Sequence, residues 1–189
     1  MNPAERHAAM AGTFTERVDG TTNWDSPSPV GGWVARDVVA HLVGWLPGFL
    51  ASGGIALTVD GPSVDEDPAA AWHAHATAVQ ALLESAAADG EFSHPQVGTH
   101  QLGATIDQFY TTDVFLHTWD LARATDQDDS LDEETCAALL AGMEPLDEIL
   151  RSSGQYGPRV PVPDDASTQD RLIGFIGRDP AWHPVAAPT

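Results

Sequence analysis

Apolar residues recur at helical spacing through most of the chain, and this pattern predicts an all-α protein. The clearest example is a helix expected over about residues 102–125. Its apolar face begins with Leu102, Ile106 and Phe109. The same face continues through Asp113, His117 and Asp120, because residues three and four apart lie on one side of a helix. The apolar stripe therefore runs directly into two carboxylates and an imidazole.

Weaker but similar stripes predict further helices over about residues 3–18, 35–50, 69–88, 131–152 and 167–176. A capping box of Ser130 and Glu133 is expected to open the fifth helix, Pro145 to kink it, and Gly177 to end the last one. No segment has a convincing strand pattern. We expect residues 1–189 to form a single domain, a four-helix bundle with additional C-terminal helices.

The chain is strongly acidic, with a formal net charge of −20 over 189 residues. Its eight basic residues are all arginine. An acidic surface repels phosphate backbones and anionic lipids, so neither nucleic-acid binding nor a membrane-surface role is expected. The acidity bears on solubility and does not identify a fold.

The cellular location is expected to be cytoplasmic. Cys136 is the single cysteine, so no internal disulfide can form, and the N-terminus lacks the pattern of a signal peptide. The charge-free segment between Asp37 and Asp60 is long enough to span a bilayer. Its glycines, its proline and its middling hydropathy argue against a transmembrane helix.

Three side chains form a candidate metal site. Asp113 and His117 lie one helical turn apart within the apolar face, and His41 borders the buried stripe of another predicted helix. Two imidazoles and one carboxylate suit zinc and leave a position open for water or substrate, although the same ligand types also bind iron. The alternative is that Asp113 and His117 form an ordinary ion pair, or that this end of the helix faces water.

The remaining candidates have mainly structural interpretations. Asp120 either orients a ligand histidine or pairs with Arg123 or another arginine, and the arginine pair is favoured. Trp45 and Tyr110 are candidate pocket walls, with core packing as the default. Cys136 is expected to be a small buried hydrophobe. His73 and His75 point too far apart on a helix to share a metal.

Two passages resemble the signatures of the DinB-like superfamily, and most closely its mycothiol-dependent maleylpyruvate isomerase-like branch. The first is residues 32–44, Gly-Trp-Val-Ala-Arg-Asp-Val-Val-Ala-His-Leu-Val-Gly. The second is residues 113–125, Asp-Val-Phe-Leu-His-Thr-Trp-Asp-Leu-Ala-Arg-Ala-Thr. The tail over residues 156–180 resembles the end of one uncharacterised subgroup of that branch. Together the matches extend over nearly the whole chain.

The resemblance implies a helical bundle that binds a divalent metal through His41, Asp113 and His117. Zinc is the first expectation, with nickel or iron as alternatives. Several members of this superfamily use the metal to activate a low-molecular-weight thiol such as mycothiol. The isomerases usually carry glutamate at the position of Asp113, and threonine is common where this chain has Val34. The extra C-terminal domain of the full isomerase is not matched, so we expect a substrate other than maleylpyruvate.

Three hypotheses about function follow. The first is a metal-dependent thiol transferase or isomerase that takes a small-molecule substrate and a thiol cosubstrate. The second is a metal-binding module without turnover, and the third is a metal-dependent hydrolase in which bound water attacks. A homodimer is compatible with all three.

Overall fold

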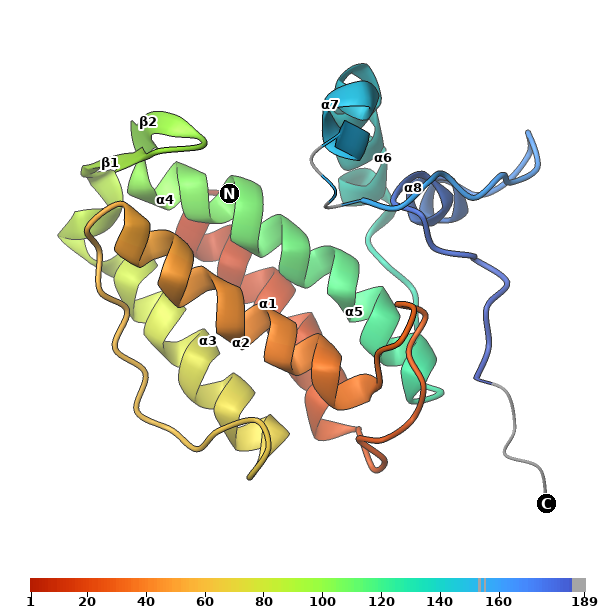
Figure 1. The fold of residues 1–189 in the computed structure, drawn as a ribbon, viewed down its shortest axis with the longest axis horizontal. Coiled ribbons are helices and arrows are strands. Elements are labelled where there is room, and N and C mark those ends of the chain that lie inside the picture. Colours follow the sequence, from red (N-terminus) through yellow and green to blue (C-terminus); the bar gives the residue numbers. More distant parts are fainter. Residues whose placement is uncertain (153, 155, 185–189) are drawn as a thin grey trace.

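The computed structural model describes residues 1–152, 154 and 156–184, and within them four long helical segments lie side by side (Figure 1). They are α1 (Pro3–Asp19), α2 (Ala35–Ser52), α3 (Pro68–Glu84) and a composite of α4 (Leu102–Thr105), the π-helical segment η2 (Ile106–Thr111) and α5 (Thr112–Ala124). α1 and α2 each pack against both α3 and α5, so they lie diagonally opposite one another in the bundle. The expected all-α class is confirmed.

Local signals explain where the first three helices begin. The side chains of Asn2 and Asp67 accept hydrogen bonds from the first turns of α1 and α3. The side chain of Val34 cannot cap α2 in this way, but its own N–H donates to the carboxylate of Asp37 at 2.8 Å. Pro47 does not end α2, which continues to Ser52.

The bundle has one main hydrophobic core, to which all four helical segments contribute. Phe14 of α1 packs on Trp72 of α3, with ring centroids 4.4 Å apart. From the composite segment, Ile106, Tyr110 and Val114 are buried. α5 is therefore held between α1 and α2, and the side facing α2 carries the candidate ligands.

The π-helical segment corrects the predicted face of the fourth helix. Phe109 was expected in the core, but Tyr110 occupies that position and Phe109 is only half-buried. Core residues four apart drift by about 40° per step in a regular α-helix. The wider turns of η2 remove this drift, so Ile106, Tyr110 and Val114 stay aligned.

A short hairpin corrects the expectation that the chain has no strands. β1 (Glu91–His94) pairs antiparallel with β2 (Gly98–Gln101) where a loop was expected. Phe92 and His94 alternate inward along β1 and cover the end of the bundle. The third helix is also shorter than predicted, because the chain is extended at Ser85 and then forms the 3-10 turn η1 (Ala86–Asp89).

The C-terminal helices pack against one side of the bundle (Figure 1). They are α6 (Glu133–Met143), the 3-10 turn η3 (Glu144–Leu146), α7 (Asp147–Ser152) and α8 (Thr168–Phe175). Pro145 was expected to kink one continuous helix; the helix is instead interrupted there by η3. The predicted Ser130 capping box is wrong, because Asp132 caps α6 by accepting from the N–H of Thr135 at 2.8 Å.

A second hydrophobic cluster joins these helices to the bundle. It combines Phe115 and Trp119 of α5 with Cys136 of α6 and Leu172 of α8. Cys136 is fully buried there, as expected of a small apolar side chain. In the part of the chain described, no helix combines the length and the hydropathy needed to cross a membrane.

Candidate metal centre

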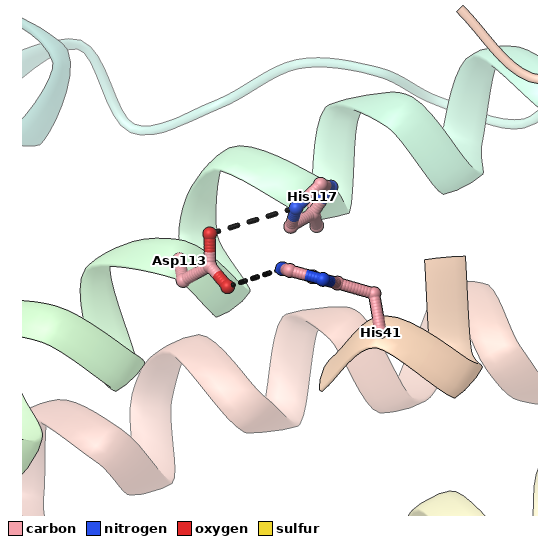
Figure 2. Close-up of side chains that lie close together, drawn as sticks. All are labelled: His41, Asp113 and His117. Carbon is pink, nitrogen blue, oxygen red and sulfur yellow. Dashed lines mark hydrogen bonds and ion pairs between the residues drawn. The ribbon is translucent and has the colours of Figure 1, made fainter. Parts of the chain in front are cut away.

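α2 and α5 bring His41, Asp113 and His117 together (Figure 2). Nε2 of His41 lies 2.9 Å from Oδ2 of Asp113. Nε2 of His117 lies 3.5 Å from Oδ1 of the same carboxylate. One ligand atom from each residue lies within 4.8 Å of the other two. Among the described residues, this is the one group of three or more His, Cys, Asp or Glu side chains that meets this criterion.

The spacing of these atoms fits a small divalent cation. Ligands bound tetrahedrally to zinc at about 2.0–2.1 Å are separated from one another by about 3.4 Å. The two nitrogen–oxygen separations, 2.9 Å to Oδ2 and 3.5 Å to Oδ1 of Asp113, lie on either side of that value, and all three ligand atoms lie within 4.8 Å of one another. The side chains of His41 and Asp113 are 32% and 23% exposed, and that of His117 is 7% exposed. A ligand from solvent can therefore reach the side of the cluster formed by His41 and Asp113.

The Asp113 carboxylate and the His117 imidazole each stabilise the charged form of the other. Burial acts to raise the pKa of Asp113, but His117 and the hydrogen bonds from His41 and Trp45 outweigh it, and the pKa is lowered. Burial acts to lower the pKa of His117, but Asp113 and Asp120 outweigh it, and the pKa is raised. Protons and a metal would thus compete for the same imidazole.

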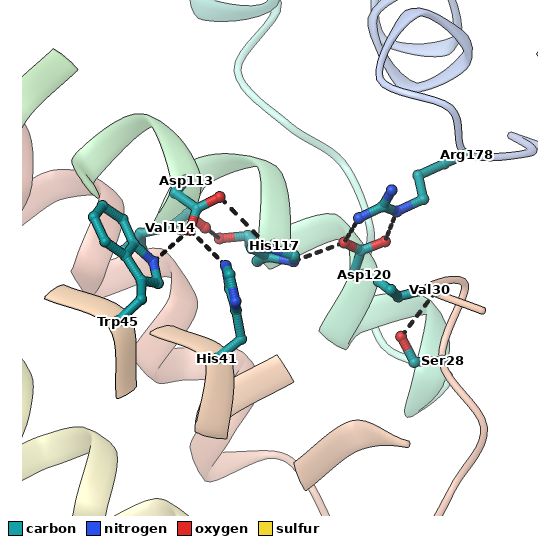
Figure 3. Close-up of polar contacts among 10 residues, drawn as sticks. Ser28, Val30, His41, Trp45, Asp113, Val114, His117, Asp120 and Arg178 are labelled. Carbon is teal, nitrogen blue, oxygen red and sulfur yellow. Dashed lines mark hydrogen bonds and ion pairs between the residues drawn. The ribbon is translucent and has the colours of Figure 1, made fainter. Parts of the chain in front are cut away.

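Two tryptophans surround the three candidate ligands. The indole N–H of Trp45 donates to Oδ2 of Asp113 at 2.9 Å (Figure 3). The ring of Trp33 stacks on His117, with centroids 5.9 Å apart, and tilts against His41 at 5.2 Å. Trp45 thus makes a polar contact in addition to packing against the main core, which was the default expectation for it. The sequence carried one signal for this contact, because Trp45 lies one turn after His41 on the same helix and therefore on the same face.

Asp120 combines both roles considered for it. Its Oδ2 accepts from Nδ1 of His117 at 2.8 Å, and Arg178 donates from Nε to Oδ1 at 3.1 Å and from Nη2 to Oδ2 at 3.3 Å (Figure 3). The arginine partner is therefore Arg178. Arg123, the partner named first from the sequence, binds Asp129 and carbonyl oxygens near the C-terminus.

Other candidate residues lie outside this cluster. His73 is exposed and pairs with Asp19, whereas His75 is buried, so the two do not share a site. Tyr156, which the sequence did not single out, is half-buried. Burial raises the pKa of Tyr156, and the Asp113 carboxylate raises it further, which places the phenol within electrostatic range of the cluster.

Comparison with known proteins identifies two relatives, both from Mycobacterium tuberculosis. They are the uncharacterized proteins MT0763 of strain CDC 1551 and Rv0738 of strain H37Rv, each 33% identical over 158 residues, covering 80% of this chain and 83% of the relative. The chain belongs to the same family as these two proteins. No family model matches it, and no solved structure matches it. This family membership therefore assigns no activity.

Proposed function

We propose that the chain is a metal-binding protein of the DinB-like superfamily. The metal is a divalent cation, zinc before nickel or iron, held by His41, Asp113 and His117. We further propose that it activates a low-molecular-weight thiol of the mycothiol type for transfer to, or isomerisation of, a small-molecule substrate. The observation that carries the proposal is the approach of two Nε2 atoms, from two different helices, to one carboxylate.

The surroundings of the trio also favour a metal. Asp120 accepts from Nδ1 of His117, which leaves Nε2 free to bind a cation. The Trp45 N–H holds Asp113 from the side of α2. Three ligands fall one short of the four that close a structural zinc site, so the fourth position is available to a thiol or to water. A bound divalent cation would lower the pKa of a thiol or water molecule in that position.

The attacking thiol must come from outside the protein. Cys136 is fully buried between α6 and α5, away from the cluster. Burial, together with Asp132 and Glu133, raises the pKa of Cys136 to about 11. The residues of this chain would therefore bind and orient the thiol, while the nucleophile belongs to the cosubstrate.

Metal content tests the first part of the proposal. Purified wild-type protein should contain stoichiometric divalent metal by elemental analysis, and the His41→Ala/His117→Ala variant should contain none. A His73→Ala/His100→Ala variant is the matched control, because it removes two exposed imidazoles outside the cluster and should keep the metal. Absence of metal from the wild type after reconstitution, or equal metal in the ligand variant, would refute the proposal.

Thiol binding tests the second part. Cobalt-substituted protein titrated with mycothiol should develop a sulfur-to-cobalt charge-transfer band. If the spectrum does not respond to mycothiol or related thiols, the thiol-dependent activity is excluded, and a hydrolase remains. Chelation tests the second hypothesis, a metal-binding module without turnover. If the metal is purely structural, its removal by a chelator should strongly lower the melting temperature.

A further inference from the structure

Arg178 reaches the candidate metal centre from the far end of the chain. It follows α8 and lies 58 residues from Asp120 in the sequence, yet its guanidinium binds both oxygens of that carboxylate (Figure 3). The Asp120 side chain is 1% exposed and that of Arg178 is 18% exposed. The contact therefore closes over a buried carboxylate that also binds His117.

The end of α8 fixes the position of Arg178. Leu172 and Ile173 anchor α8 in the second hydrophobic cluster. Gly177 then takes a left-handed conformation, φ +88°, which ends the helix. The N–H of Arg178 donates to the carbonyl of Ile173 at 3.0 Å. The backbone of Arg178 is thus tied to a packed helix, and only its side chain extends toward α5.

We propose that Arg178 is a positioning residue for the metal ligand His117 and acts through Asp120. The inference rests on the proposed metal function. The guanidinium is a planar fork whose two N–H groups match the two carboxylate oxygens. It sets the plane of the Asp120 carboxylate, and Oδ2 of that carboxylate then receives the Nδ1–H of His117. The imidazole is thereby held with Nε2 directed at Asp113.

The same chain of contacts links the metal to the C-terminal helices. Coupling between two binding events is reciprocal. If docking of Arg178 improves the geometry of His117, metal binding must equally stabilise the docked end of α8. Amide hydrogen exchange around residues 173–178 should therefore slow when zinc is added, although none of these residues is a ligand.

Zinc affinity, measured by competition with a chelator, tests the proposal. Asp120→Asn should weaken binding by about 10- to 100-fold, and Arg178→Gln by about tenfold. Arg178→Lys, which keeps the charge but loses the fork, should fall between Arg178→Gln and wild type. Arg171→Gln, which removes a more exposed arginine of α8, is the matched control and should leave the affinity unchanged.

The double variant Asp120→Asn/Arg178→Gln decides whether Arg178 acts through Asp120. In Arg178→Gln the buried Asp120 carboxylate loses its arginine partner, which can impair folding. The double variant removes that carboxylate as well, so the proposal stays testable if Arg178→Gln folds poorly. It should bind zinc as Asp120→Asn does, within roughly twofold. Three results would overturn the positioning role alone. They are a zinc affinity of the double variant reduced by the product of the two single losses, a wild-type zinc affinity in Arg178→Gln, and amide hydrogen exchange at residues 173–178 that does not change when zinc is added. Absence of zinc binding by the wild type would overturn the proposed function as well.

Discussion

The buried imidazole of His75 predicts that the bundle loses stability in mild acid. His75 lies on α3, is 1% exposed, and its Nε2 has no hydrogen-bond partner among the described residues. Burial, and to a lesser extent repulsion from His7, lowers the pKa of His75 to about 4 from the ordinary 6.5. The folded protein therefore keeps this side chain neutral at a pH where the unfolded chain takes up a proton.

The size of the effect follows from linkage between protonation and folding. Above pH 6.5 both states are mostly neutral and His75 adds no pH dependence. Between pH 6.5 and 4 the unfolded state binds the extra proton, so the free energy of unfolding decreases as the pH falls. From pH 7 to pH 5, His75 alone should remove about 2 kcal/mol. For a chain of this size, that loss lowers the melting temperature by roughly 4 to 8 °C.

Comparison of variants isolates this contribution. Wild type and His75→Phe are melted in chelator at pH 7, 6 and 5, and the loss of stability from pH 7 to pH 5 should be about 2 kcal/mol smaller in the variant. The cost of fitting the larger ring does not depend on pH and cancels in the slope. His73→Gln, an exposed histidine of the same helix, should retain the steep dependence. Parallel curves for wild type and His75→Phe would refute the reasoning.

Three further predictions concern other parts of the structure. Trp45→Phe removes the N–H that donates to Asp113 and should weaken zinc binding by about tenfold in the chelator competition; unchanged affinity would make that hydrogen bond irrelevant to the site. Gly177→Ala places a Cβ at φ +88° and 3.0 Å from the carbonyl of Pro158, so denaturant unfolding should show a loss of at least about 1 to 2 kcal/mol, and a neutral result would contradict the assigned backbone conformation. Cys136 should resist iodoacetamide in the native protein at pH 7.5 and react on unfolding, because its thiol is buried and its pKa is raised to about 11; rapid native labelling would show that α6 opens.

Regular periodicity explains why the main helices and the candidate ligands could be predicted. His41, Asp113 and His117 occupy inward or seam positions of long amphipathic helices, where spacing alone indicates the face. The resemblance of residues 32–44 and 113–125 to one family supplied the pairing between the two helices. The structure brings these three side chains together as that pairing requires.

The missed features depend on interactions that local patterns do not carry. The contact between Arg178 and Asp120 spans 58 residues and depends on how α8 packs. The π-helical turns of η2 have no distinctive composition, so the shift from Phe109 to Tyr110 emerges only from packing. The hairpin has strands of four residues each, too short for a reliable alternation.

The position of η2 separates the start of the fourth helical segment from its ligand-bearing part. Val114, Asp113 and His117 all lie on the regular winding of α5, so the angle between its core face and its ligand face is fixed. η2 instead sets how α5 is rotated relative to Leu102 and Ile106, which are buried before and at its start. A residue added to a regular helix would turn everything beyond it by about 100°, whereas wide π turns can take up a change of one residue locally. A change of chain length within η2 can therefore be absorbed before it reaches the ligands, which the same change within α5 could not.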